Sequence, residues 1–353
     1  MKIAFLSDLA SIHTVRWVNI FADHGHEVHV ISIRKPTEPL HESVHVHLLP
    51  FSAPIGYYLN VFSLKKILHE IKPNVLNAHY ASGYGTLGRL SCFHPYVLSV
   101  WGSDVYDFPY ESKVKMNIIQ KNLDAADVIC STSKVMKKQT ETLLRKPKSI
   151  FVTPFGIDTN LFTPKKNFSE KVKVIGTIKT LAPKYGIDTL IKTFSLLLDK
   201  IGRDTDISLV IAGDGPQREE LKQLAINLHV EDKCRFLGKI PHKKVPDVLH
   251  TFDIYVALSE SESFGVAILE ASACGVPVIV SDAGGLPEVV EDGVTGIVVP
   301  RNDSQTAAQA LYRLVNNPHT RLKLGKNGVK RVNNSYNWIG SYFIFQNILN
   351  NII

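Results

Sequence analysis

The feature that most constrains this chain is a regular alternation of short β-branched segments with longer helical patterns. In the first half the apolar segments read KIAFLS, EVHVISI, VHVHLL and NVLNAHY, with helical patterns at 14–23 and 59–71. After Pro164 the alternation resumes with KVKVIGTI, DISLVIAG, KCRFLG, DIYVAL, PVIVSD and GIVVP. Strands that alternate with helices form parallel sheets covered by those helices. The sequence therefore predicts an α/β protein.

A segment rich in Pro, Gly, Asn and Lys, TPFGIDTNLFTPKKNFSEK, separates the two sets of strands. The chain has 353 residues, whereas single hydrophobic cores usually stop growing near about 250–300 residues. We therefore predict two Rossmann-like, doubly wound domains, at 1–166 and 167–337. The apolar last helix, 338–353, needs a packing surface, and we expect it to pack back on the first domain.

Composition excludes several classes of protein. Hydrophobic residues make up 44% and charged residues 21%, which is typical of a globular chain and not of a disordered or collagen-like one. No uncharged apolar run reaches about 18 residues, so no membrane-spanning helix is predicted. The N-terminal apolar stretch is broken by Asp8 and His13, unlike a secretory signal, so we expect a cytoplasmic protein.

Metal and disulfide frameworks are not predicted. The four cysteines are far apart and form no Cys-x-x-Cys pair. Histidines gather before residue 100, and His45 and His47 share one face of a strand, as metal ligands can. No Asp, Glu or Cys recurs near them at a ligand spacing. We therefore expect neither a metal nor another cofactor.

Basic residues cluster between Lys134 and Lys148 in a chain of net charge +7. No nucleic-acid motif and no interleaved aromatic residues accompany them, so nucleic acid is not predicted as a partner. The apolar companions of the cluster are Val135, Met136, Leu143 and Leu144. One helix could thus present a charged and an apolar face to an anionic membrane surface, at the inner face of the membrane. An ordinary solvated helix face is the alternative.

The stretch SESESFGVAILEASACGVPVIVSDAGGLPEVVEDGVTG, at 259–296, combines glycines, carboxylates and a helix start. A helix N-terminus beside a glycine binds phosphate through free backbone N–H groups. A carboxylate farther along that helix can accept hydrogen bonds from ribose hydroxyls, and a buried glutamate needs a partner. The candidate donor-binding residues here are Phe264, Gly265, Glu270, Gly284 and Gly285, and Glu262 is a candidate catalytic residue.

Two lysines, Lys179 and Lys184, follow the first strand of the second domain in GTIKTLAPKYGID. Two cations at the carboxyl end of a strand suit a diphosphate that gains negative charge as a bond breaks. Taken alone, the two residues are better explained as ordinary surface lysines. Together with 259–285 they favour a site for a nucleoside diphosphate.

These segments resemble those of retaining glycosyltransferases of family 4, the group 1 glycosyl transferases. The matching pieces are Glu262-x7-Glu270 with its FG and EA neighbours, GVPVIVSDAGGLPEVV, IAGDGP at 211–216, FLG at 236–238, PFGIDTNLF at 154–162, and IHTVRW and GHEV near the start. The resemblance covers essentially the whole chain. It implies the GT-B fold, in which two Rossmann-like domains face an interdomain cleft. It also implies transfer of a sugar from a nucleotide-sugar, with retention at the anomeric carbon and no required metal.

The resemblance assigns roles to individual residues. Lys179 and Lys184 would bind the diphosphate, although the first position is more usually Arg, so bidentate phosphate binding is lost. Glu262 would lie near the sugar and Glu270 would hold the ribose, with Gly213 as a further donor-binding position. We expect a UDP- or GDP-linked donor and a glycan or lipid-linked acceptor in cell-surface polysaccharide biosynthesis.

Two departures from the family pattern fall on the acceptor side. The family's His-Gly-x-Asp segment reads WGSD at 101–104, and SIH at 11–13 replaces a glycine-rich loop. No histidine role can therefore be assigned at 101. The predicted acceptor-side residues are His13, His79, Trp101 and Asp104.

Three alternatives stay open. Gly83, Gly85 and Gly88 fit G-x-G-x-x-G after the strand NVLNAHY, with Asp104 about 20 residues on, as in an NAD-dependent oxidoreductase. This match follows three earlier strands and leaves 259–285 unexplained. A nucleotide-sugar epimerase would use a similar donor site without an acceptor. A non-enzymatic nucleotide-sugar sensor would keep the lysines without needing Glu262.

Overall fold

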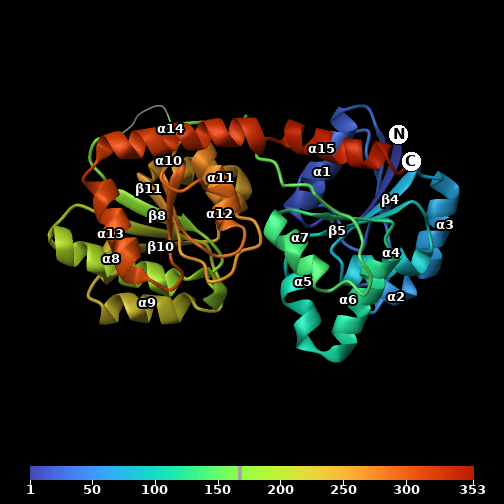
Figure 1. Ribbon diagram of the computed structural model, residues 1–353, viewed down its shortest axis with the longest axis horizontal. Coiled ribbons are helices and arrows are strands. Elements are labelled where there is room, and N and C mark those ends of the chain that lie inside the picture. The colour runs from blue at the N-terminus through green and yellow to red at the C-terminus, as the bar shows by residue number, and fades with distance from the viewer. Residues whose placement is uncertain (166–168) are drawn as a thin grey trace. The chain divides into compact units, whose positions relative to one another are not determined.

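The computed structural model describes residues 1–165 and 169–353, which form two compact units (Figure 1). Unit 1 comprises Met1–Phe155 and Trp338–Ile353, and unit 2 comprises Gly156–Asn337. The boundary predicted between residues 166 and 167 lies outside the described residues. The observed division comes earlier because the segment after Phe155 packs on unit 2, where the ammonium of Lys165 donates to the carbonyl of Phe252 at 2.9 Å.

Unit 1 contains a seven-stranded parallel sheet of order β3-β2-β1-β4-β5-β6-β7. Its strands are β1 (Lys2–Leu6), β2 (Glu27–Ser32), β3 (His45–Leu48), β4 (Val75–His79), β5 (Tyr96–Val100), β6 (Val128–Ser131) and β7 (Ile150–Val152). In the register of the sheet, Ile3 of β1 lies opposite both Val28 and Val75. The strand order reverses between β1 and β4, and ligands of such sheets bind beyond the carboxyl ends of the strands at this point.

Helices cover both faces of this sheet (Figure 1). They are α1 (Ile12–Asp23), α2 (Gly56–Leu59), α3 (Val61–Ile71), α4 (Gly83–Ser91), α5 (Ser103–Tyr106), η1 (Phe108–Glu111), α6 (Lys113–Ala125), α7 (Lys134–Glu141) and α15 (Trp338–Asn350). The last helix, α15, packs on α1 through aromatic rings: the ring centroid of Trp17 lies 5.0 Å from that of Trp338 and 5.3 Å from that of Phe345. The C-terminal helix thus belongs to unit 1.

Unit 2 contains a six-stranded parallel sheet of order β10-β9-β8-β11-β12-β13. Its strands are β8 (Val174–Ile178), β9 (Ser208–Ala212), β10 (Cys234–Gly238), β11 (Ile254–Ala257), β12 (Val278–Ser281) and β13 (Gly296–Val299). The helices around it are η2 (Pro183–Tyr185), α8 (Ile187–Ile201), α9 (Arg218–Asn227), η3 (Glu231–Lys233), η4 (His242–Lys244), α10 (Val245–Thr251), α11 (Val266–Ala273), α12 (Leu286–Val289), α13 (Ser304–Val315) and α14 (Pro318–Ser335). The order reverses between β8 and β11, so loops after these two strands form the natural binding edge.

Both sheets explain the apolar runs of the sequence. Every residue of β4, β5, β11 and β12 is buried, because parallel strands covered on both faces have no solvent side. These two doubly wound, Rossmann-like units confirm the predicted α/β fold class. Across the two described stretches, none of the helices combines the length and the apolar character needed to cross a bilayer.

Candidate functional site

The carboxyl ends of β8 and β11 bring the two predicted diphosphate lysines together with Glu262. Lys179 follows β8 directly, and its ammonium forms an ion pair with the carboxylate of Glu262 in the loop after β11. The two side chains are 10% and 13% exposed. The ammonium of Lys179 lies 4.8 Å from the ring centroid of Tyr185, and that of Lys184 lies 5.5 Å from the same centroid. We call Lys179, Lys184, Tyr185 and Glu262 the lysine cluster.

Lys179 carries a charge that burial alone would suppress. Desolvation lowers the pKa of its ammonium, but the Glu262 carboxylate, with Tyr255 and Tyr185 nearby, outweighs that effect and raises the pKa above its ordinary value. Lys179 is therefore a cation at neutral pH whose charge is balanced by Glu262. An anionic ligand at this edge would compete with Glu262 for it.

Glycines hold the loops of the lysine cluster at backbone contact distance. A β-carbon at Gly213 (φ +131°) would lie 1.8 Å from the carbonyl oxygen of Lys179, and one at Gly284 (φ +48°) would lie 2.0 Å from that of Glu262. The N–H of Gly285 donates to the same Glu262 carbonyl at 2.9 Å. These three predicted donor-site glycines thus allow the close backbone contacts that position Lys179 and Glu262.

Lys184 lies on η2, which is tied to the loop after β11. The N–H groups of Glu260 and Ser261 donate to the carbonyl of Lys184, at 2.9 and 3.2 Å. A β-carbon at Gly186 (φ +61°) would lie 1.9 Å from the carbonyl oxygen of Leu258. The position of η2 is therefore set by backbone contacts, while the side chain of Lys184 is exposed.

Glu270 lies inside α11 and is 6% exposed. Its Oε1 lies 2.9 Å from Nε2 of His242, the first residue of η4 after β10. The ring centroid of His242 lies 5.4 Å from that of Phe162. His242 thus supplies a partner that a buried glutamate requires, and the sequence prediction missed it. The signal that could have found it is the basic run His242–Lys244, which follows the strand CRFLG and so emerges at the same edge of the sheet.

The start of α11 is shaped by packing. Phe264 is 3% exposed, and its ring centroid lies 5.9 Å from that of Tyr336. A β-carbon at Gly265 (φ +107°) would lie 2.9 Å from the side chain of Leu286. Both predicted residues therefore set where α11 begins.

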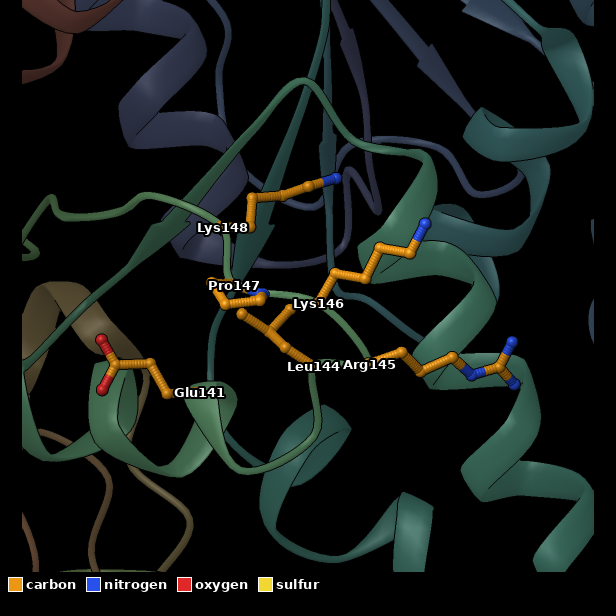
Figure 2. A pocket seen from close by; sticks show the side chains of 6 residues that line it. All are labelled: Glu141, Leu144, Arg145, Lys146, Pro147 and Lys148. Atoms are coloured by element: carbon orange, nitrogen blue, oxygen red, sulfur yellow. The ribbon is translucent and has the colours of Figure 1, made fainter.

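The basic cluster Lys134–Lys148 does not form the single helix that the sequence predicted. The helix α7 ends at Glu141, and the cluster continues as a turn around a pocket of about 350 Å³ (Figure 2). Met136 and Leu143 are 0% and 2% exposed and belong to the core of unit 1. One helix over the whole cluster is therefore not formed, and Met136 and Leu143 are not available to a membrane, while Val135 and Leu144 are half-buried.

Part of the charge in this cluster is also used within unit 1. The ammonium of Lys148 donates to the carbonyls of Leu123 and Asp124, at 3.0 and 2.7 Å, and to that of Ala126. Burial lowers the pKa of Lys148, although nearby aspartates oppose this. Lys148 thus caps the carboxyl end of α6, where a cation meets the unpaired carbonyls of the helix.

The predicted acceptor-side residues of unit 1 gather at the carboxyl ends of β1, β4 and β5. The ring of His13 stacks on that of Phe155, with centroids 4.1 Å apart, and the ring of His79 lies 4.3 Å from that of Trp101. The rings of Trp101 and Phe155 lie 5.3 Å apart, centroid to centroid. Phe155, which the sequence prediction missed, joins the three predicted rings into one aromatic cluster.

His79 is fully buried within this cluster. Its Nδ1 lies 3.0 Å from Oγ of Ser7, and its Nε2 lies 2.6 Å from Oδ1 of Asn77. Burial, assisted by His13, lowers the pKa of His79 to about 3. The imidazole is therefore neutral at physiological pH. Its contacts with Ser7 and Asn77 fix the orientation of the ring beside Trp101.

Asp104 is also fully buried. Its carboxylate accepts the N–H groups of Ala81 and Gly102, each at 2.7 Å, and that of Trp101 at 3.2 Å. Burial raises the pKa of Asp104, and these hydrogen bonds oppose the rise. Asp104 thus holds the loop that presents Trp101.

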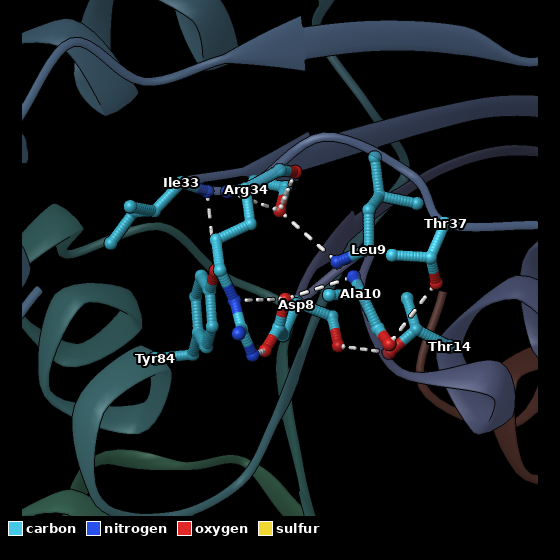
Figure 3. Close-up of polar contacts among 10 residues, drawn as sticks. Asp8, Leu9, Ala10, Thr14, Ile33, Arg34, Thr37 and Tyr84 are labelled. Atoms are coloured by element: carbon cyan, nitrogen blue, oxygen red, sulfur yellow. Dashed lines mark hydrogen bonds and ion pairs between the residues drawn. The ribbon is translucent and has the colours of Figure 1, made fainter. Parts of the chain in front are cut away.

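The loop between β1 and α1, the helix that carries His13, is tied to the end of β2 by polar contacts (Figure 3). The guanidinium of Arg34 donates from Nε to Oδ1 of Asp8 at 2.9 Å, and its Nη2 pairs with the other carboxylate oxygen. The N–H of Ile33 donates to the hydroxyl of Tyr84 at 3.2 Å. An ion pair and side-chain contacts therefore hold this loop, which lacks the family's glycines.

The glycines of the dinucleotide-like motif are explained by packing against rings. A β-carbon at Gly83 would lie 2.3 Å from the ring of Tyr57, and one at Gly88 would lie 2.7 Å from the hydroxyl of Tyr96. At Gly85 it would lie 3.2 Å from the carbonyl oxygen of Tyr80. The spacing therefore serves the close contact of α4 with its neighbours and needs no dinucleotide.

The histidines of β2 and β3 satisfy one another. Nδ1 of His29 lies 3.0 Å from Nε2 of His47, and Nε2 of His29 lies 3.2 Å from a carboxylate oxygen of Glu27. The ring of His45 stacks on that of His29, with centroids 4.7 Å apart. Within residues 1–165 and 169–353, no group of three or more His, Cys, Asp or Glu residues is arranged to hold a metal ion.

The chain is similar to known proteins in family, sequence and fold. The family described as glycosyl transferases group 1 matches residues 158–331, and that described as glycosyl transferase 4-like matches residues 2–133. The chain is 26% identical over 266 residues to N-acetyl-alpha-D-glucosaminyl L-malate synthase of Bacillus anthracis, covering 69% of this chain and 68% of the relative.

Two solved structures share the fold over nearly the full chain. Sucrose-phosphate synthase from Thermosynechococcus elongatus has a TM-score of 0.85 at 20% identity, with 99% of each chain covered. Anabaena HepE in complex with UDP-glucose has a TM-score of 0.81 at 19% identity, with 99% of this chain and 100% of HepE covered. The two parallel sheets are thus those of the GT-B architecture.

Proposed function

This chain belongs to the GT-B glycosyltransferases of family 4, and from that membership we propose that it moves a sugar from a UDP- or GDP-linked donor to a glycan or lipid-linked acceptor. We further propose retention at the anomeric carbon and a place in cell-surface polysaccharide biosynthesis. The observation that carries the donor assignment is the lysine cluster, which places two cations and a carboxylate at the strand edge where the order of the second sheet reverses. HepE, which shares the fold, was crystallised with UDP-glucose.

In the proposed donor complex, the diphosphate lies against Lys184 and Lys179. Negative charge grows on it as the bond to the sugar breaks, and fixed cations stabilise that charge most in the transition state. Lys179 then exchanges Glu262 for a phosphate oxygen. The carboxylate of Glu262 is released from its ion pair by this exchange and accepts a hydrogen bond from a sugar hydroxyl.

The proposed ribose contact is Glu270. A carboxylate can accept from two hydroxyls at once, which gives geometric specificity for a ribose. His242 lies 2.9 Å from one of its oxygens and orients the group before the ligand arrives. We expect His242 to act as a positioning residue for this contact.

We favour attack from the same face of the sugar over a covalent enzyme intermediate. The covalent route needs a second carboxylate placed on the far face of the sugar. Asp282, the other acidic candidate in the stretch, accepts the N–H of Arg301 at 3.0 Å and pairs with its guanidinium at 3.1 Å. Asp282, the residue after β12, therefore binds the backbone and side chain of Arg301.

On the acceptor side we propose the aromatic cluster of His13, His79, Trp101 and Phe155. Aromatic faces suit the apolar C–H faces of sugar rings, and neutral His79 adds no charge. His13 and Trp101 are half-buried, so they are the members through which this cluster would touch an acceptor.

The test is release of nucleoside diphosphate from a panel of UDP- and GDP-sugars, with glycan and lipid-linked acceptor preparations. We expect release and labelled acceptor with the unmodified protein, and both slowed about 10²–10³-fold with Lys184→Ala. Lys192→Ala, which removes an exposed lysine of α8 paired with Asp188, serves as the matched control. A change of the donor sugar without release would indicate an epimerase, and binding without any turnover would indicate a sensor; either result would overturn the proposal.

A further inference from the structure

Unit 1 carries a group of exposed apolar side chains around α2 and the start of α3, two helices that follow one another in the chain (Figure 1). Phe62 is 86% exposed and Ile55 is 65% exposed, whereas large apolar side chains elsewhere in unit 1 mostly form its core. Two exposed lysines follow on α3. We call the following seven residues the 51–66 surface: Phe51, Ile55, Tyr58, Leu59, Phe62, Lys65 and Lys66.

The 51–66 surface is held in place by buried polar contacts. The side-chain amide of Asn60, which is 0% exposed, donates to the carbonyl of Phe51 at 2.8 Å, and its oxygen accepts the N–H of Phe51 at 3.1 Å. A β-carbon at Gly56 would lie 2.2 Å from that same carbonyl oxygen. The exposure of these side chains is therefore built into the fold of the segment.

The inward-facing apolar residues of α3 are already buried in unit 1. Leu64 and Leu68 of α3 are 0% and 4% exposed, so the packing of α3 on unit 1 does not need Phe62. On an α-helix, positions three and four residues apart lie on one face. Phe62, Lys65 and Lys66 therefore share an outward face of α3. An apolar group of this kind, rimmed by polar residues, marks an interaction site.

The charge of this segment selects the partner. Between residues 43 and 69, Lys65 and Lys66 are the only Lys, Arg, Asp or Glu residues. Just beyond, Glu70 lies 4.0 Å from the ammonium of Lys66, an exposed pair that contributes little. Aromatic and aliphatic side chains beside lysines suit the boundary between lipid headgroups and acyl chains, where lysine stems lie along apolar surface and their ammonium groups reach the phosphates.

A second copy of the chain fits this surface less well. In a two-fold symmetric contact the same patch meets itself. Lys65 and Lys66 of one copy would then approach the same lysines of the other within a segment that offers no carboxylate of its own. An anionic lipid surface supplies the missing negative charge.

We propose that the 51–66 surface docks the protein on anionic lipid bilayers, with Ile55 and Phe62 entering the headgroup boundary and Lys65 and Lys66 facing the phosphates. This site replaces the basic cluster Lys134–Lys148 as the membrane contact. Tyr57, next to this surface, packs on Tyr84 with ring centroids 5.3 Å apart, and Tyr84 in turn bonds the end of β2. Docking at this surface would let a lipid-linked acceptor reach the aromatic cluster from the bilayer. This consequence rests on the proposed function.

The experiment is flotation of the full chain with vesicles of phosphatidylcholine alone or with phosphatidylglycerol added. We expect binding to the anionic vesicles that weakens as salt is raised. At about 1 kcal/mol for each lysine near the surface, Lys65→Gln with Lys66→Gln should weaken binding about 30-fold. Phe62→Ser should weaken it about tenfold or more, since an exposed phenylalanine loses its burial in lipid.

Two control variants remove an exposed apolar side chain or two positive charges from other parts of unit 1. Val114→Ser removes an exposed apolar side chain of α6, 68% exposed, and should leave binding unchanged. Lys137→Gln with Lys138→Gln removes two charges from the basic cluster and should also leave it unchanged. All substituted side chains lie at the surface, and far-ultraviolet circular dichroism with a melting curve checks the fold of each variant.

Several results would overturn the proposal. They are absence of the unmodified protein from floated anionic vesicles, equal recovery on neutral vesicles, or loss of binding with Lys137→Gln and Lys138→Gln but not with Phe62→Ser. Light scattering that shows a dimer without lipid, abolished by Phe62→Ser, would assign the surface to a second copy instead. Because flotation needs no donor or acceptor, its failure is distinguishable from failure of the proposed sugar transfer.

Discussion

Replacing Glu262 by Gln should separate donor binding from transfer. The carboxylate of Glu262 is paired with Lys179, and a nucleoside diphosphate must displace it from that lysine. Glu262→Gln leaves Lys179 without its counter-charge, so the variant should bind UDP more tightly than the unmodified protein. Transfer should nevertheless slow, because the proposed contact of the carboxylate with the sugar is lost.

The burial of the pair sets the magnitudes. The two side chains are 10% and 13% exposed, and removing one partner of a buried pair costs about 3–5 kcal/mol. We expect the free energy of unfolding of unit 2 to fall by about 3 kcal/mol, at the lower end of that range. Some of this is regained when UDP supplies the missing charge, and a tenfold gain in UDP affinity corresponds to about 1.4 kcal/mol.

The pH dependence gives a second expectation. Burial lowers the pKa of Lys179, and Glu262 is the main group that raises it. Without Glu262 the pKa of Lys179 falls, so the ammonium loses its proton at a lower pH. As the pH is raised, the UDP affinity of Glu262→Gln should therefore decline earlier than that of the unmodified protein.

Calorimetric titration of UDP and thermal unfolding with and without UDP measure both effects. Glu260→Gln is the matched control, because Glu260 lies in the same loop but is exposed, and it should change neither quantity. UDP binding that weakens in Glu262→Gln, or a melting temperature equal to that of Glu260→Gln, would refute the competition between Glu262 and the diphosphate.

Four further substitutions test other contacts. Lys184→Ala should lower kcat about 10²–10³-fold in a sugar-transfer assay while Lys192→Ala leaves it unchanged, since a fixed cation acts mainly on the transition state; a rise in KM alone would contradict this role. Glu270→Gln should weaken UDP binding about tenfold or more, and His242→Gln should weaken it less, as titration calorimetry can show. The native pKa of His79 is about 3 against an ordinary 6.5. Stability from neutral His79 is therefore full above 6.5 and falls as the pH drops toward 3. His79→Gln should flatten that decline in urea unfolding by up to about 1.4 kcal/mol per pH unit.

The sequence predicted the fold because hydrophobic periodicity and strand–helix alternation are local properties. Ligands of parallel sheets bind beyond the carboxyl ends of the strands, and on this ground the sequence also predicted that Lys179 and Glu262 lie at one edge of the sheet. What it could not supply is the pairing of their charges. Residues 83 positions apart meet only because β8 and β11 are neighbours in the sheet.

Other site residues depend on packing that a sequence does not display. His242 meets Glu270 because η4 follows β10 and folds toward α11; the sequence places the basic run His242–Lys244 after a strand but does not show that its first residue reaches α11. Asp104 fits a dinucleotide motif by spacing, yet it is buried and holds backbone N–H groups. Spacing alone does not separate a ligand-facing carboxylate from one that caps a loop.

Two surfaces of unit 1 that combine apolar and basic residues show the same limit. Basic and apolar residues alternate at 134–148 in a way that resembles an amphipathic helix, but Met136 and Leu143 complete the core. At 59–71 the periodicity predicts one ordinary helix, whereas the structure breaks it at Asn60, which secures the loop at Phe51. Which apolar face is exposed was decided by tertiary packing in each case.

The most direct test of the central claim is a crystal structure of the protein with UDP or a UDP-sugar. We expect phosphate oxygens within hydrogen-bonding distance, about 2.7–3.2 Å, of the ammonium groups of Lys179 and Lys184. We also expect Glu262 to be released from Lys179, and ribose hydroxyls to bind the carboxylate of Glu270. A nucleotide bound at Gly83–Gly88 of unit 1, or one whose phosphates leave the Lys179–Glu262 pair intact, would contradict the proposed donor site.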